Sequence, residues 1–271
     1  TIPVPSEVDG RIPEVRAVER SGWLFRMDRG FAQYPPEEPQ RIFVPAARMI
    51  GTGQILPLFR IAAKEDVVLS GDLLDVLETS LPAFAPRMKA DRPFAEAVRE
   101  EFLALLASRQ DISYARSRLR LLGYLQVILP EFGRLLSLTR ADIVHRYTLD
   151  VHALKAVEFF ERLAVRRTPE WDETREHVGA ALAWLEERHL WRVMRASLLL
   201  QTLHEVDPKL VTQTLKPLGL SREETRLVRW LHEHQHDFID LIRRRGLLDA
   251  EQLSAFVRRH IQSDYDRWTL L

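Results

Sequence analysis

The sequence has 271 residues, of which 46% are hydrophobic and 29% charged, so it is too apolar for a disordered chain and should fold. Its 39 Lys and Arg residues balance its 39 Asp and Glu residues, and no net charge draws it towards nucleic acid or anionic membranes. The absence of cysteine excludes disulfides, thiolate metal sites and cysteine nucleophiles, and leaves histidine and carboxylate as the metal ligands.

The chain also lacks the segments that direct a protein into or across a membrane. No apolar run approaches the roughly 20 residues of a membrane span, and the N-terminus has no basic region followed by an apolar stretch. We therefore expect a cytoplasmic protein with no membrane and no nucleic-acid partner. Because the sequence begins at Thr1 rather than methionine and ends on the apolar run 268–271, we expect a piece of a longer protein.

The first fifty residues are rich in proline, which prevents long regular elements. The only apolar runs there are short, at 23–25 and 42–44. We predict an extended N-terminal arm over 1–50, with room for one hairpin. Its prolines are Pro3, Pro5, Pro13, Pro35, Pro36, Pro39 and Pro45.

Apolar residues recur with helical spacing from Ile55 onward, which predicts a helical annex over 51–125. Ser70, Asp91 and Asp111 stand where these helices should begin, and Gly123 follows the last one. The predicted apolar stripes are Ile55, Leu58, Phe59 and Ala62; Leu69, Leu73, Leu74 and Leu77; Phe94, Val98, Phe102 and Leu105; and Ile112, Ala115, Leu119 and Leu122.

Beyond Pro130 the helical pattern is stronger, and the predicted fold class is all-α. Ser221 with Glu224 and Asp249 with Gln252 have the spacing of capping boxes. No glycine-rich phosphate loop occurs, which excludes P-loop and Rossmann nucleotide binding. Helices are predicted near 142–166, 173–188, 190–206, 209–217, 222–245 and 250–271.

Residues 119–160 carry the most specific motif in the chain. A glycine-leucine run around Gly123 and a Pro-x-Phe-Gly turn at Pro130 precede a His-x-Tyr-Thr-x-Asp-x-His block over 145–152. This succession resembles the stretch that opens the HD domain of the bacterial PII uridylyltransferase family. The resemblance runs more weakly from about Ile42 to the end, and the family's nucleotidyltransferase and ligand-sensing domains fall outside it.

The resemblance implies a metal site. An HD site holds a divalent ion with a histidine on one helix, a His-Asp pair on a second and an aspartate on a later helix, and it keeps an open position for water. His152 matches the first histidine, and His204-Glu205 stands where the His-Asp pair belongs. The candidate ions are manganese, magnesium, iron and zinc, and the alternative is that none is bound. The metal-ligand candidates are His152, His204 and Glu205, with His145, Tyr147 and Asp150 as secondary candidates.

The sequence departs from the family's site pattern. Glu205 replaces aspartate, which lengthens the ligand by about 1.5 Å where metal distances are held to about 0.2 Å. The family's glycine-rich insertion with a further histidine is missing, because Pro208 runs almost directly into the next helix. The final aspartate would follow the run 269–271, where the sequence stops, and Asp264 and Asp266 precede that position.

A competing motif lies near the C-terminus. His232-Glu233-x-x-His236 matches the His-Glu-x-x-His pattern, which on a helix places two histidines for zinc beside a glutamate base. A metalloprotease also needs a third ligand, for which Glu251 is the nearest candidate, and a strand-rich subdomain, which we do not expect. The family's pattern also has a histidine segment on this helix. We therefore favour a solvated polar face.

Two functions follow from the resemblance. The first is a degenerate HD module of a PII uridylyltransferase-like nitrogen-signalling protein, serving as a regulatory or scaffold unit. The alternative is an active metal-dependent phosphodiester hydrolase that removes uridylyl groups from the PII protein. The departures from the site pattern favour the first. The expected partners are a PII-type signal protein and the other domains of a longer chain. We predict an arm over 1–50, an annex over 51–125 and an HD-like domain, C-terminally truncated, over 126–271.

Overall fold

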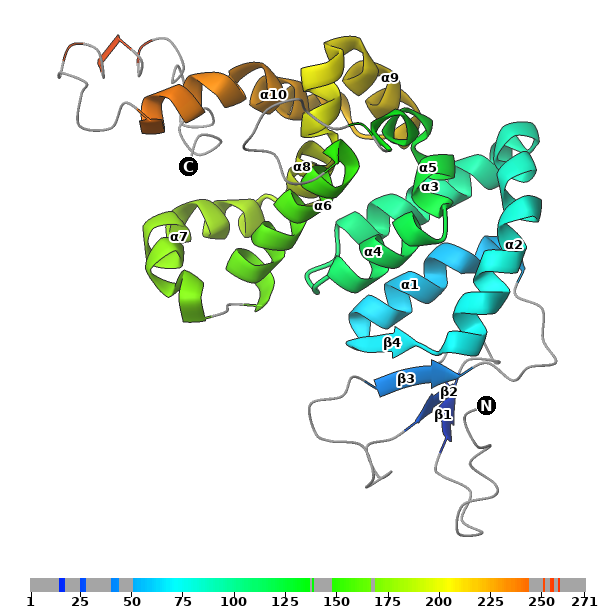
Figure 1. Cartoon of the computed structure of the whole chain (residues 1–271). Coiled ribbons are helices and arrows are strands. Elements are labelled where there is room, and N and C mark those ends of the chain that lie inside the picture. Colours follow the sequence, from blue (N-terminus) through cyan, green and yellow to red (C-terminus); the bar gives the residue numbers. More distant parts are fainter. Residues whose placement is uncertain are drawn as a thin grey trace. The chain divides into compact units, whose positions relative to one another are not determined.

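The structure is a computed structural model in which the chain divides into two compact units, Thr1–Ile128 and Leu129–Leu271 (Figure 1). Outside a few short strands, most of the described residues are helical, and the all-α prediction is confirmed. The predicted division into arm, annex and HD-like domain stays a prediction. The structure describes residues 51–136, 138, 148–166, 169–243, 251, 254, 255 and 258, together with three strands before residue 51.

Four short strands form a small sheet in the first unit. The strand order is β1-β2-β3-β4, with antiparallel pairing except for β3 and β4, which are parallel. Leu69, expected on a helical stripe, is instead a buried strand residue whose backbone N–H donates to the Tyr114 hydroxyl at 2.8 Å. The strands are β1 Val15–Ala17, β2 Phe25–Met27, β3 Gln40–Phe43 and β4 Val67–Leu69.

Among the described residues, the first unit also contains a 3-10 turn over Thr52–Gln54 and five α-helices. Two of them, α2 and α3, begin at predicted capping residues, since Ser70 Oγ accepts from the Leu73 N–H at 3.3 Å and Asp91 Oδ1 accepts from the Phe94 N–H at 3.0 Å. The helices are α1 Ile55–Lys64, α2 Gly71–Ala90, α3 Arg92–Leu106, α4 Ser113–Leu121 and α5 Tyr124–Ile128.

Aromatic side chains fill the centre of this first core. The ring centroid of Phe84 lies 5.5 Å from that of Phe94 and 5.0 Å from that of Tyr124, both in edge-on geometry. The Tyr124 hydroxyl donates to the Leu77 carbonyl, and burial raises the pKa of Tyr124. Gly123 joins α4 to α5 with φ +84°, a conformation that favours glycine.

The second unit is built around α8, which packs against α6, α9 and α10 (Figure 1). A 3-10 turn over Pro130–Leu135 precedes α6, a π-helical turn over Glu161–Arg166 follows it, and a 3-10 turn over Pro169–Trp171 leads into α7. The α-helices whose bounds the structure describes in this unit are α6 Leu149–Phe160, α7 Asp172–Glu187, α8 Trp191–Val206, α9 Pro208–Leu218 and α10 Arg222–Arg243.

The helix ends of the second unit follow local sequence signals. The predicted capping box of α10 is confirmed, because Ser221 Oγ accepts from the Glu224 N–H at 3.1 Å and the Glu224 carboxylate accepts from the Ser221 N–H at 2.9 Å. Gly219 ends α9 with φ +82°. Asp207 both ends α8 and caps α9. The box predicted at Asp249 lies outside the described residues.

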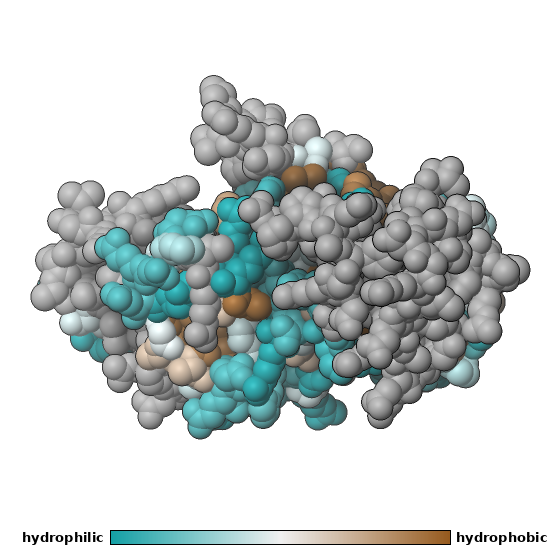
Figure 2. All heavy atoms as spheres, turned by 90° about the horizontal axis from the view of Figure 1, so that it is seen from below, coloured by the Kyte–Doolittle hydropathy of each residue, from teal (hydrophilic) through white to brown (hydrophobic). Residues whose placement is uncertain are grey.

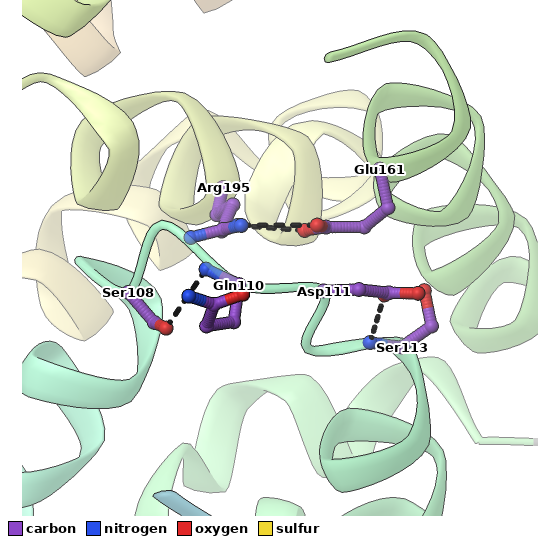
Figure 3. A network of polar contacts seen from close by, with 6 residues as sticks. All are labelled: Ser108, Gln110, Asp111, Ser113, Glu161 and Arg195. Carbon is purple, nitrogen blue, oxygen red and sulfur yellow. Dashed lines mark hydrogen bonds and ion pairs between the residues drawn. The ribbon is translucent and has the colours of Figure 1, made fainter. Parts of the chain in front are cut away.

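A buried ion pair holds the π-helical turn to α8. Arg195 donates to Glu161 through Nε at 2.6 Å and through a terminal nitrogen at 3.0 Å, and neither side chain is exposed (Figure 3). The Arg195 guanidinium also lies 5.2 Å from the Trp191 ring centroid. The pair therefore places two charges inside the core, where each charge compensates the cost of burying the other.

The described surface is mainly hydrophilic on the face drawn in Figure 2, with small hydrophobic areas between polar ones. The large apolar side chains that are exposed among the described residues belong to separate elements, as is normal for a folded protein. No described helix is both long and apolar enough to cross a bilayer. The exposed residues are Leu121, Leu138, Phe159 and Val206.

Candidate functional site

The start of α6 carries two of the predicted site residues. Asp150 lies in the first turn and is fully buried, and His152 is half-buried, with its backbone N–H donating to the Thr148 carbonyl at 2.8 Å. A carboxylate in a first turn is favoured by the helix dipole. The secondary candidates His145 and Tyr147 lie outside the described residues.

The last turn of α8 carries His204, whose side chain is half-buried. Glu205 is the next residue of the same helix, and its side chain lies outside the described part of the structure. Because α6 packs against α8, His152 and His204 are on helices that contact each other. That both side chains belong to one ligand set stays a prediction.

The ring of His204 lies beside that of His232 on α10. The two ring centroids are 5.6 Å apart and the ring planes are inclined by 50°. His232 is only 2% exposed, and its Nε2 lies 2.8 Å from the Ser197 carbonyl oxygen on α8. Since a carbonyl oxygen only accepts, Nε2 carries the hydrogen and Nδ1 carries the lone pair.

The surroundings of His232 keep its ring neutral. Its pKa is lowered to about 4, chiefly by burial, while the hydrogen bond to Ser197 raises it and nearby His204 adds to the lowering. His232 therefore holds no proton on Nδ1 at neutral pH. Nδ1 is buried and has no hydrogen-bond partner among the described residues. A neutral imidazole with a buried lone pair is thus set beside His204.

The other residues of the His-Glu-x-x-His motif lie in different surroundings. Glu233 and His236 are exposed, whereas His232 is buried against α8. His234 is half-buried, with its Nδ1 at 3.0 Å from Asp237 Oδ2 and its ring centroid 5.0 Å from that of Trp230. Across the described residues, no three His, Asp or Glu side chains come together as a ligand set for one ion.

The pairing of His232 with His204 was not predicted from the sequence. The His-Glu-x-x-His motif relates His232 only to His236, one turn further along the same helix. A signal was present, because Glu224, Leu227 and Val228 are buried and His232 continues their helical spacing. That spacing predicts a buried His232, although it does not identify the helix against which it packs.

No protein-family model matches the chain. Curated proteins named bifunctional uridylyltransferase/uridylyl-removing enzyme are similar to it. The one from Rhodospirillum rubrum is 28% identical over 211 residues, which is 75% of this chain and 21% of that protein. The one from Phenylobacterium zucineum is 26% identical over 215 residues, covering 75% of this chain and 22% of that protein.

A third relative gives the same picture. The protein of the same name from Azospirillum brasilense is 27% identical over 185 residues, covering 65% of this chain and 19% of its own length. The chain therefore spans about a fifth of the length of the curated relatives it matches. The resemblance predicted from residues 119–160 is confirmed: most of this chain is similar to one region of the bifunctional uridylyltransferase/uridylyl-removing enzymes.

Proposed function

We propose that the chain is an HD-like helical module of a PII uridylyltransferase-like nitrogen-signalling protein, and that it acts as a regulatory or scaffold unit rather than as a hydrolase. Its similarity to a region of the uridylyltransferase/uridylyl-removing enzymes supports the placement. The glutamate at position 205, where the family pattern has aspartate, supports the loss of hydrolysis. Its partners are a PII-type signal protein and the other domains of a longer chain.

The main support for the proposal is the side chain that lies next to His204. Its ring lies beside the imidazole of His232, which is buried and bonded to the Ser197 carbonyl. In the HD pattern this histidine shares the ion with another histidine and with two aspartates, which supply negative charge and oxygen ligands. Magnesium and manganese prefer oxygen ligands, so an imidazole in this place makes the site a poorer one for them.

The active hydrolase is the second candidate, and one observation favours it. Because α6 packs against α8, His152 and Asp150 lie on a helix that contacts the helix of His204. In that case His152, His204 and Glu205 would hold a divalent ion, which supplies an activated water for phosphodiester hydrolysis. The substitution at position 205 weighs against this set, since its carboxylate is displaced by a methylene.

The experiment is a hydrolysis assay with manganese, using a generic phosphodiester and uridylylated PII protein. We expect little or no turnover by the chain, and none restored by Glu205→Asp. His152→Ala is the diagnostic variant, and His236→Ala is a matched control at an exposed histidine. Turnover by the unmodified chain that persists in His236→Ala and disappears in His152→Ala would establish the hydrolase instead.

A further inference from the structure

We propose that His204 of α8 and His232 of α10 form a two-histidine site for a borderline divalent transition metal such as Zn²⁺ or Co²⁺. The inference goes beyond the proposed function, and it gives a ligand role to His204, a residue that the family pattern also places at its metal site. It differs in the second ligand, which comes from α10 rather than from the carboxylate after His204. Such a site joins two helices and requires no hydrolysis.

The separation of the two rings suits a shared ion. Zinc–nitrogen bonds are about 2.0–2.1 Å long, so two histidines on one tetrahedral ion have ring centroids about 5 Å apart. The centroids of His204 and His232 are 5.6 Å apart, with an inclination of 50° between the rings. A shift of a few tenths of an ångström in a half-buried side chain brings the pair to that separation.

The hydrogen bonding of His232 is that of a metal ligand. Its Nε2–H donates to the Ser197 carbonyl at 2.8 Å, which fixes the ring and leaves Nδ1 as the atom with the lone pair. Metal-bound histidines commonly donate their other N–H to a backbone carbonyl in this way. The buried Nδ1 has no hydrogen-bond partner among the described residues, and an ion would satisfy it.

The chemistry of the pair also selects the ion. Two imidazole ligands favour zinc, cobalt, nickel and copper over magnesium and manganese. His204 is half-buried and lies in the last turn of α8, so the ion can be reached from its side and water can complete the coordination. The binding of the ion then stabilises the packing of α10 against α8.

The test is titration of the metal-stripped chain with Zn²⁺ by calorimetry and with Co²⁺ by visible absorption. We expect one ion per chain, bound at least about tenfold more weakly in His204→Ala and in His232→Ala. If His232→Ala does not fold because a buried side chain is removed, the weaker binding expected of His204→Ala is the test of the site. His152→Ala and His236→Ala should bind as the unmodified chain does, because neither residue belongs to this pair.

Other outcomes overturn the inference. Loss of binding in His152→Ala would assign the ion to the family's ligand set, and loss in His236→Ala would assign it to the protease-like pair. Equal binding by all variants would show adventitious surface binding only, and no binding would show that the pair is not a site. Manganese-dependent turnover would overturn the proposed function but not this site, whereas failure to bind Zn²⁺ would overturn the site alone.

Discussion

Arg195 on α8 and Glu161 on the π-helical turn face each other through two hydrogen bonds, at 2.6 Å and 3.0 Å, with neither side chain exposed. Replacing one partner leaves the other charge buried without its counter-ion, which costs about 3–5 kcal/mol. We expect Glu161→Gln to lower the free energy of unfolding by this amount in denaturant titrations. Glu96→Gln, at the exposed pair with Arg92, is the matched control and should change little. Equal losses would contradict the prediction.

The start of α10 offers a test of local stabilisation. Ser221 Oγ accepts from the Glu224 N–H, so Ser221→Ala leaves that donor without its cap. We expect the free energy of unfolding to fall by about 1 kcal/mol. Ser117→Ala, at an exposed position inside α4, is the control and should be neutral or slightly stabilising, because alanine is the better helix former. A Ser221→Ala variant as stable as the parent would mean that water replaces the cap without cost.

The buried His232 predicts a loss of stability in acid. Its pKa is about 4 in the folded chain, against an ordinary value of 6.5, so between these pH values the unfolded chain binds a proton that the folded chain does not. The free energy of unfolding therefore falls as the pH drops from about 6.5 to about 4, by about 3 kcal/mol in total. Measured in the presence of a chelator, His232→Gln should remove this part of the pH dependence. His236→Gln, at an exposed site, should keep it.

Gly123 tests the turn between α4 and α5. Its φ of +84° disfavours residues with a Cβ, and an added Cβ would lie 2.8 Å from Leu81 Cδ2. We expect Gly123→Ala to lower the free energy of unfolding by about 1–2 kcal/mol. Gly71→Ala is the control, because a Cβ there meets no atom within 4 Å at the start of α2. Similar stabilities of the two variants would show that the turn relaxes to accept alanine.

Helix positions and caps were predictable from the sequence because they depend on residues a few positions apart. The Ser221–Glu224 box and the Asp91 cap are confirmed for this reason, as is the burial of Ile55, Leu58 and Phe59. A strand depends on a partner that may come from anywhere in the chain. Val67–Leu69 pairs with β3, more than twenty residues earlier, and its apolar residues also fit a helical stripe.

Only those residues of the candidate site that belong to sequence motifs were predictable. The family resemblance singled out His152 and His204 as candidates, and these residues lie on contacting helices. The partner of His204 was not identified, because His232 is 28 residues away and no local pattern encodes which helix faces α8. Glu161 and Arg195 were missed for a related reason. Charged residues are normally exposed, and only the packed structure shows that these two are mutually neutralised in a core.

Asp207, the single residue between α8 and α9, couples the local opening of one helix to that of the other. Asp207 has an extended backbone, its N–H donates to the Leu203 carbonyl at the end of α8, and its carboxylate accepts from the Lys209 N–H at the start of α9. No loop lies between the helices to absorb a local opening. Fraying of the last turn of α8, which contains His204, must therefore also uncap α9. The amide hydrogens on both sides of this corner should exchange with solvent through one shared opening event.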